Sequence, residues 1–111
     1  ILAMFAKGKT IVRDAKELRY KESDRISLLL SNIKSFNPNI KVQEFDDGFE
    51  LEPCEDKNME RVKIKTGGDH RMAMSFMVAS LRSGKKVEFD DMECVETSFP
   101  GFFSLIERWY Q

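Results

Sequence analysis

Two stretches of the chain repeat apolar residues at the spacing of an α-helix, and a short segment rich in β-branched or alternating apolar residues precedes each of them. The second stretch, which Gly67-Gly68-Asp69 opens and which runs to about Ser83, is apolar over most of its circumference, so we expect it to be deeply buried. The first stretch, residues 22–36, carries apolar residues at i, i+3, i+4, i+7 and i+10, namely Ile26, Leu29, Leu30, Ile33 and Phe36. Strands and helices that alternate in this way favour an α/β (α+β) fold.

The other segments complete the expected order of elements. Residues 1–6 resemble the last turns of a helix that Gly8 ends, and from this opening we expect the chain to be a fragment of a longer one. Asp46-Asp47-Gly48 joins two short apolar runs and is typical of a β-hairpin. The composition of the remaining segments predicts strands over 9–14, 40–45, 49–52, 61–66 and 85–90 and a last helix over 98–110. Arg25 and Arg71 follow similar strand-to-helix turns, a weak internal repeat that suggests duplication of a small α/β unit.

Size and charge exclude several classes of protein. A length of 111 residues fits one domain or part of one. Lys plus Arg number 18 and Asp plus Glu number 19, so the net charge of −1 argues against a nucleic-acid partner. No apolar run is long enough for a membrane span, and no membrane partner is expected. Cys54 and Cys94 lack a CxxC spacing and are interpreted as buried or half-buried thiols of a reducing cytoplasm.

The densest candidate site is the segment around Lys21, Glu22 and Arg25, at a strand-to-helix junction. Lys21 and Arg25 are four residues apart, so both cations would lie on one side of a helix start that normally favours acidic residues. A bound phosphate or carboxylate would resolve this mismatch. Glu22 between them could transfer a proton or simply pair with a cation. A solvated turn held by ion pairs is the simpler alternative.

The second candidate site is Thr66-Gly67-Gly68-Asp69-His70-Arg71. Paired glycines allow backbone amides to approach a ligand, Asp69 is a natural N-cap, and Arg71 presents a planar donor group from the first turn. The loop lacks the Lys-Ser/Thr of a Walker motif. His70 is the single histidine, and no Cys or His pair has zinc spacing, so no metal site is expected.

A third segment, residues 94–100, needs no ligand to explain it. Ser98 would cap the last helix and Phe99 would enter the core.

Taken together, Leu18-Arg19-Tyr20-Lys21-Glu22-Ser23-Asp24-Arg25-Ile26, Gly68-Asp69-His70-Arg71-Met72-Ala73-Met74 and residues 94–100 closely resemble the C-terminal part of the 5-enolpyruvylshikimate-3-phosphate synthases. The resemblance covers essentially all of the chain. It implies that residues 1–111 are a single partial domain, the C-terminal portion of a two-domain enzyme whose domains are built from repeated βαβαββ units.

The resemblance also implies a reaction. Such enzymes transfer the enolpyruvyl group of phosphoenolpyruvate to the 5-hydroxyl of shikimate 3-phosphate and release phosphate, without a metal or organic cofactor. Lys21 matches the family lysine near the reacting hydroxyl and both substrates, and Glu22 matches the acid near the methylene carbon of phosphoenolpyruvate. Arg25 and Arg71 match the two arginines that bind phosphoenolpyruvate, with His70 beside them.

Two features depart from the family pattern. Thr97 stands where the family usually has a lysine in Cys-x-x-Lys-Ser/Thr-Phe-Pro, so the role of that lysine is not transferred. The family's aspartate base belongs to a segment that precedes residue 1. We therefore expect the isolated chain to be inactive without the missing N-terminal part of the same enzyme, to self-associate through exposed sheet edges, and to be cytoplasmic.

Two alternatives with a function of their own remain open, besides a chain that is only a structural or interaction piece. One is an enzyme similar to UDP-N-acetylglucosamine enolpyruvyl transferase, which shares the fold. The other is a standalone binding module of similar fold, such as an RNA-processing or translation-factor domain, and the near-zero net charge speaks against it.

Overall fold

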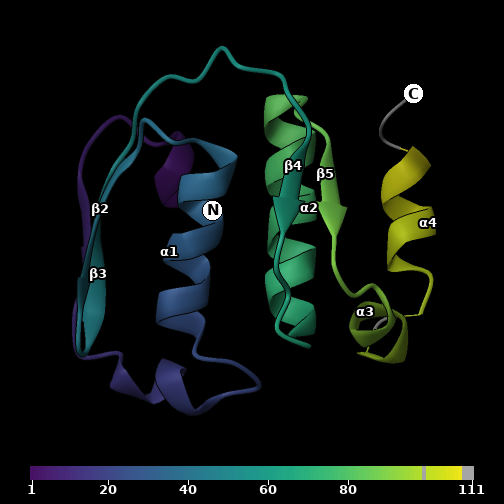
Figure 1. The fold of residues 1–111 in the computed structure, drawn as a ribbon, viewed down its shortest axis with the longest axis horizontal. Coiled ribbons are helices and arrows are strands. Elements are labelled where there is room, and N and C mark those ends of the chain that lie inside the picture. The colour runs from purple at the N-terminus through teal and green to yellow at the C-terminus, as the bar shows by residue number, and fades with distance from the viewer. Residues whose placement is uncertain (99, 109–111) are drawn as a thin grey trace. The chain divides into compact units, whose positions relative to one another are not determined.

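The computed structural model describes residues 1–98 and 100–108. The chain divides into two compact units, one of residues 1–58 and one that begins at Met59. The first unit contains, in chain order, η1 (Leu2–Phe5), β1 (Thr10–Val12), η2 (Lys16–Tyr20), α1 (Arg25–Phe36), β2 (Lys41–Phe45) and β3 (Gly48–Glu52), where η is a 3-10 helix. The second contains β4 (Val62–Ile64), α2 (His70–Ser83), β5 (Val87–Phe89), α3 (Glu93–Ser98) and α4 (Phe102–Glu107) (Figure 1). The predicted mixture of helices and strands is confirmed.

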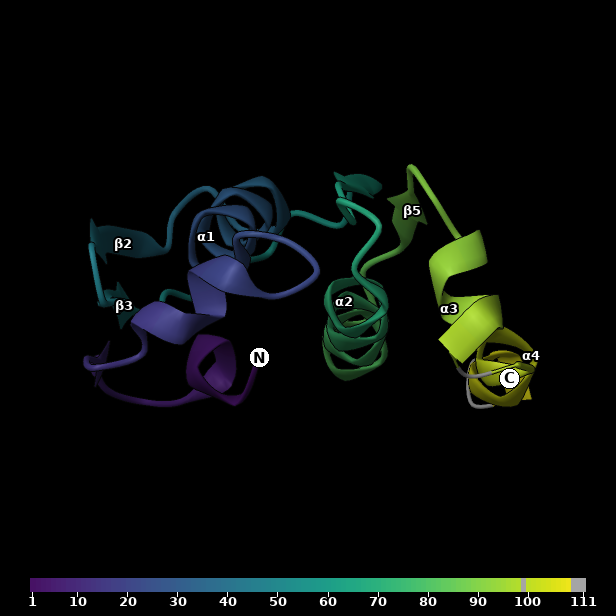
Figure 2. The same cartoon turned by 90° about the horizontal axis from the view of Figure 1, so that it is seen from below.

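The first unit is an antiparallel sheet covered on one face by helices. Its strand order is β1-β3-β2, so β3 pairs with both neighbours and the predicted hairpin of β2 and β3 is confirmed. Helix α1 packs against the sheet on the same face as the N-terminal turn η1 (Figure 2). The core of this unit consists of the buried residues Met4, Ile26, Leu30, Ile33, Phe36, Ile40, Phe49 and Leu51. The helical spacing thus correctly predicted the buried side of α1, apart from Leu29, which is half-buried.

Helix α1 begins later than predicted. The sequence indicated a start at Glu22, whereas the first helical residue is Arg25 and Asp24 is the N-cap, whose carboxylate accepts a hydrogen bond from the Ser27 amide. Residues 16–20 form the 3-10 helix η2, which the sequence did not predict. The Asp24 cap explains the shift, because a capping side chain stops the helix from extending toward its N-terminus.

Gly48 allows β1 to approach the hairpin. A Cβ atom built on Gly48 would lie 1.8 Å from the carbonyl oxygen of Val12. Because no side chain fits at that distance, the neighbouring strand requires glycine here.

The second unit is a two-stranded parallel sheet, β4 and β5, with α2 packed beside it. In β4, Val62 and Ile64 are buried and Lys63 is exposed, as the alternation predicted. A cluster of Ala73, Val95, Phe102 and Ile106 joins α2, α3 and α4. The deep burial expected for α2 is met in part. Its residues Met72, Ala73, Phe76 and Ala79 are buried, whereas Met74, Met77 and Leu81 are half-buried and Val78 is 47% exposed.

The C-terminal part corrects the prediction of one helix over 98–110. The short helix α3 ends at Ser98, the short helix α4 begins at Phe102, and Gly101 between them adopts a φ of +82°. Ser98 is the last residue of α3, so it does not cap a helix that starts there. Pro100 and Gly101 separate the two helices because proline lacks the amide donor and glycine adopts the left-handed conformation. Phe99 and the expected helix end at Tyr110 lie outside the described residues.

The two cysteines differ from each other. Cys94 is half-buried as expected, whereas Cys54 is exposed, which corrects the prediction for that residue. Among the described residues, no helix combines the length and apolar character that a membrane span requires.

Candidate functional site

The first candidate segment, residues 21–25, links η2 to α1. Lys21 is exposed, has an extended backbone at the end of η2, and lies outside α1. The expectation that Lys21 and Arg25 share one side of the helix is therefore wrong, because the Asp24 cap separates them. Within the described part of the chain, no hydrogen bond or ion pair engages the Lys21 ammonium group.

Glu22 and Arg25 form the ion pair that the simpler interpretation of this segment required. The Arg25 Nη2 donates to Glu22 Oε2 at 2.5 Å, with the arginine side chain 17% exposed and the glutamate side chain 53% exposed. Arg25 is the first residue of α1 and Glu22 precedes the Asp24 cap, so the pair lies at the start of the helix, where free backbone amides also favour an anion. A carboxylate held by a cation and open to solvent is suited either to accept a charge-assisted hydrogen bond or to exchange a proton.

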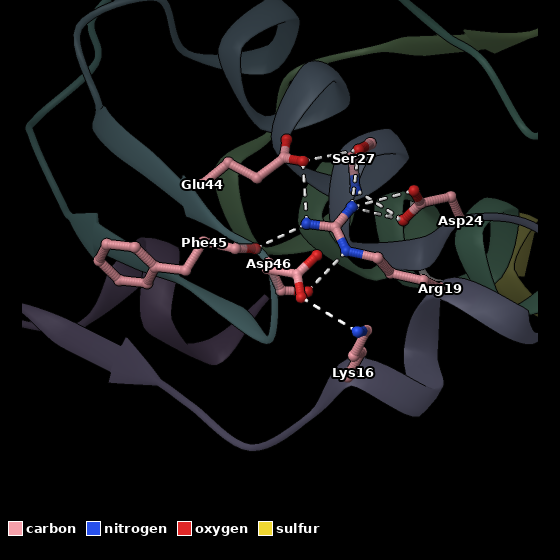
Figure 3. A network of polar contacts seen from close by, with 7 residues as sticks. All are labelled: Lys16, Arg19, Asp24, Ser27, Glu44, Phe45 and Asp46. Carbon is pink, nitrogen blue, oxygen red and sulfur yellow. Dashed lines mark hydrogen bonds and ion pairs between the residues drawn. The ribbon is translucent and has the colours of Figure 1, made fainter.

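Arg19 organises the segment from within, and the sequence did not predict its role. Its guanidinium lies between the start of α1 and the end of the β2–β3 hairpin (Figure 3). The side chain is only 15% exposed. It donates to both carboxylate oxygens of Asp24, to Ser27 Oγ, to Glu44 Oε2 and to the carbonyl oxygens of Phe45 and Asp46, at 2.6 to 3.2 Å. Three of these partners are 25 or more positions away in sequence, so local spacing carries no signal of them.

The carboxyl group of Asp24 reflects this environment. Its partial burial acts to raise the pKa, but the Ser27 amide and the Arg19 guanidinium stabilise the carboxylate, and the net pKa lies below the ordinary aspartate value. Asp24 therefore stays ionised and holds both the helix cap and Arg19.

The second candidate segment, residues 66–71, turns from β4 into α2. Gly67 and Gly68 adopt φ values of +58° and +72°, which explains the paired glycines. Thr66 anchors the loop, because its amide and hydroxyl both donate to Asp90 Oδ1, at 2.9 and 2.8 Å. The Thr66 hydroxyl also accepts the Gly68 amide at 3.3 Å. Asp90 is a positioning residue that the sequence analysis missed, since it follows β5, 24 positions away.

Asp69 caps α2 as predicted, and its carboxylate accepts the amide hydrogen bond of Arg71 at 3.1 Å. His70 is half-buried and begins the helix, and Arg71 is exposed in its first turn. Among the described residues, none pairs with the Arg71 guanidinium. The segment therefore presents a free cation beside a helix N-terminus, an arrangement suited to a phosphate or carboxylate.

The five expected site residues fall in both units. Lys21, Glu22 and Arg25 belong to the first unit, and His70 and Arg71 belong to the second. Thr97 lies in α3, and its side chain is outside the described part of the structure. In the described chain, no group of three or more His, Cys, Asp or Glu residues is arranged to hold a metal ion.

Comparison with known proteins relates both segments to one family. Residues 1–106 match the family described as EPSP synthase (3-phosphoshikimate 1-carboxyvinyltransferase). A 3-phosphoshikimate 1-carboxyvinyltransferase of Thermotoga sp. is 44% identical over 108 residues, which cover 97% of this chain and 25% of that protein. The enzyme of the same name from Campylobacter jejuni subsp. doylei is 49% identical over 104 residues, covering 93% of this chain and 23% of its own length.

Solved structures agree with these relatives. The structure of EPSP synthase from Acinetobacter baumannii, solved at 2.37 Å, superposes with a TM-score of 0.75 at 33% identity and covers 96% of this chain and 24% of its own. The chain thus spans about a quarter of the length of the proteins that it matches.

Proposed function

Because the chain belongs to the EPSP synthase family, we propose that the protein carrying it is a 3-phosphoshikimate 1-carboxyvinyltransferase. It transfers the enolpyruvyl group of phosphoenolpyruvate to the 5-hydroxyl of shikimate 3-phosphate and releases inorganic phosphate. This reaction belongs to the shikimate pathway, which leads through chorismate to the aromatic amino acids. The enzyme acts in the cytoplasm.

One observation carries this proposal: a single family match covers residues 1–106 and so includes both cationic segments. Each segment ends in an aspartate-capped helix with an arginine in its first turn. Substrates that bear a phosphate and a carboxylate require several cations fixed in advance at the place where charge develops.

We assign the residues as follows. Lys21, unpaired in the described chain, binds near the reacting 5-hydroxyl and contacts both substrates. Arg25 and Arg71 bind phosphoenolpyruvate, with His70 beside Arg71. Glu22 is the acid at the methylene carbon, which gains a proton as the 5-hydroxyl oxygen bonds to the neighbouring carbon. The hydroxyl proton passes to the aspartate base that the rest of the enzyme supplies. The resulting tetrahedral intermediate then expels phosphate while its new methyl group loses a proton, which restores the carbon–carbon double bond.

The domain assignment is part of the same proposal. Residues 1–111 form part of one domain, in the C-terminal portion of a two-domain enzyme. The rest of the enzyme supplies the second domain, the aspartate base and the remaining phosphate ligands. It follows that the 111-residue chain alone does not release phosphate from the two substrates.

The proposal is tested with the full-length protein that carries this chain. Mixed with phosphoenolpyruvate and shikimate 3-phosphate, it is expected to release phosphate at a rate that depends on both substrates. With UDP-N-acetylglucosamine in place of shikimate 3-phosphate, no release above background is expected. Turnover only with the nucleotide sugar would overturn the assignment in favour of the related transferase, and turnover with neither would overturn the proposal of a carboxyvinyl transfer.

A second experiment tests the role of Glu22. Glu22→Gln keeps the size of the side chain but removes its proton, so kcat should fall by about 10²- to 10⁴-fold while the KM values change little. Glu17→Gln, on the exposed surface of η2, is the matched control and should leave kcat unchanged. If kcat of the Glu22 variant holds and only KM moves, Glu22 acts by pairing with Arg25 and is not the acid.

A further inference from the structure

The guanidinium group of Arg19 has every one of its donors engaged. An arginine side chain carries five N–H groups in a fixed planar arrangement. In Arg19, Nε donates to the Asp46 carbonyl at 2.7 Å, and Nη2 donates to Glu44 Oε2 and to the Phe45 carbonyl at 3.0 and 2.6 Å. Nη1 donates to Asp24 and to Ser27 Oγ. An arginine satisfied in this way has no donor left for a substrate.

The partners of Arg19 come from two places. Asp24 and Ser27 belong to the capped start of α1, and the other partners belong to the end of the β2–β3 hairpin. The Ser27 hydroxyl also donates to Glu44 Oε2 at 2.9 Å, which gives the two places a second link. Arg19 therefore fastens the start of α1 to the sheet of the first unit (Figure 3).

The same contacts enclose the candidate segment. Arg19 and Asp24 are five positions apart and hydrogen-bonded, so the residues between them, which include Lys21 and Glu22, are held at both ends. Arg25 follows Asp24 directly and pairs with Glu22. The location of all three side chains thus depends on the bond between Arg19 and Asp24.

We propose that Arg19 is a positioning residue for the reaction, which fixes Lys21, Glu22 and Arg25 through Asp24 without touching a substrate. The inference rests on the proposed function, because it assigns a purpose to the geometry of that site. Lysine cannot replace Arg19, since a single ammonium group offers three donors from one point and cannot reach the hairpin carbonyls and the Asp24 carboxylate together. Displacement of reacting groups by about 1 Å can cost on the order of 10²-fold in rate.

The test compares two arginine variants of the full-length protein. In Arg19→Lys, kcat/KM for phosphoenolpyruvate is expected to fall by about 10- to 100-fold. The control is Arg13→Lys. The Arg13 guanidinium is held against the same hairpin, with Cζ 4.4 Å from the centre of the Phe45 ring and Nε 2.9 Å from Asp47 Oδ1, but in the described chain it forms no hydrogen bond or ion pair with residues 21–25. The control should retain its kinetics within about threefold. Equal kinetics in both variants and the parent would overturn the proposal.

A double-mutant cycle separates positioning from a general structural role. If Arg19 acts through the placement of Arg25, the losses caused by Arg19→Lys and Arg25→Lys should be less than additive in kcat/KM. The losses caused by Arg13→Lys and Arg25→Lys should add. Additive losses in both cycles would show that Arg19 contributes only to stability and would overturn the proposal.

Hydrogen exchange keeps the inference separable from the proposed function. The Ser27 amide donates to Asp24, so Arg19→Lys should increase its exchange rate by about tenfold or more while the Asn37 amide at the other end of α1 is unchanged. If the parent protein lacks transferase activity, the proposed function fails. The role of Arg19 is overturned separately if Ser27 exchange is unchanged in Arg19→Lys. If Arg19→Lys does not fold, Asp24→Asn keeps a capping oxygen but loses the charge, and the same shifts in kinetics and exchange are expected for it.

Discussion

The cationic side chains of the two candidate segments fall into two groups. Arg19 and Arg25 are held by carboxylates of the first unit, at 2.5 to 3.2 Å. Lys21 and Arg71 have no such partner among the described residues. An arginine or lysine that the protein leaves unpaired beside a helix N-terminus is free to bind an anion, whereas an arginine that is fully paired has a structural role. At the scale of single residues, the candidate binding groups are therefore the unpaired cations and Arg25.

Arg71→Lys tests this distinction in the full-length protein. The substitution keeps the charge but loses the planar fork, so we expect kcat/KM for phosphoenolpyruvate to fall by about 10²-fold. Arg82→Lys, in the last turn of the same helix, is the matched control and should have little effect. Steady-state kinetics with both variants make the measurement. Unchanged kinetics of Arg71→Lys would show that Arg71 does not bind the substrate.

At the scale of secondary structure, side-chain caps and close strand contacts set where each element begins. Asp24 and Asp69 cap α1 and α2, and Asp90 fixes the loop that precedes α2. In the sheet of the first unit, Gly48 makes room for the carbonyl of Val12. These few contacts hold the two candidate segments at the ends of their strands and helices.

Gly48→Ala should destabilise the chain because the new methyl group would overlap the Val12 carbonyl. We expect the free energy of unfolding to fall by about 2 to 3 kcal/mol, the size of a strained overpacking change. Urea denaturation followed by circular dichroism measures it. Gly8→Ala is the control, since a Cβ there meets no atom within 4 Å, and its effect should stay within about 0.5 kcal/mol. Equal midpoints for the two variants would contradict the close approach.

The capping and anchoring carboxylates predict acid sensitivity. The pKa of Asp47 is lowered by the hydrogen bond from the Asp14 amide, in spite of partial desolvation. Burial acts to raise the pKa of Asp90, but hydrogen bonds from Thr66 outweigh it and lower the net value. The pKa of Asp24 is lowered in the same way. The folded state binds protons at these carboxylates more weakly than the unfolded chain does. The stability that the three carboxylates contribute is therefore complete above their unfolded pKa of about 3.9, and it is lost as the pH falls through their folded pKa values.

We therefore expect the free energy of unfolding to decline steeply below about pH 4. The decline should be smaller in a variant that lacks one of these carboxylates. Asp90→Asn removes a titrating carboxyl, so its stability should depend less on pH in this range. Urea titrations from neutral to acidic pH give the comparison. A curve for Asp90→Asn parallel to that of the parent would show that Asp90 does not contribute to the acid response.

At the scale of the whole molecule, the described sheets are small and have open edges. The outer strands of the first sheet, β1 and β2, each pair on one side only, and the second sheet consists of β4 and β5. Ile11 on β1 is 58% exposed and Leu2 is 86% exposed. Open strand edges and exposed apolar side chains favour pairing with another chain.

We predict that the isolated 111-residue chain self-associates. Sedimentation at micromolar concentrations should show dimers or larger species, and Ile11→Lys should shift the distribution toward monomer because a charge on an edge strand opposes pairing. A single monomeric species for the parent chain would mean that its edges are closed in another way. Full-length protein, in which other segments are expected to cover these edges, should not respond to Ile11→Lys in this manner.

Local features of the sequence determined the two long helices, the strands and the family, but not η2, α3 or many of the element ends. Apolar spacing identified α1 and α2, Asp46-Asp47-Gly48 identified the hairpin, and Asp69 was identified as a cap. These signals act over a few residues, because helix periodicity, capping and turn formation are local interactions. The motifs around Lys21 and Arg71 identified the candidate site for the same reason.

Contacts between residues far apart in the chain were decided by the tertiary structure alone. The five-donor network of Arg19, the anchoring of Thr66 by Asp90 and the contact of Gly48 with Val12 each join residues more than 20 positions apart. The structure also decided which cation pairs with Glu22: Arg25 forms the ion pair, and Lys21 does not. Sequence spacing cannot show such contacts, because they depend on how strands pair and on which face of a helix meets the sheet.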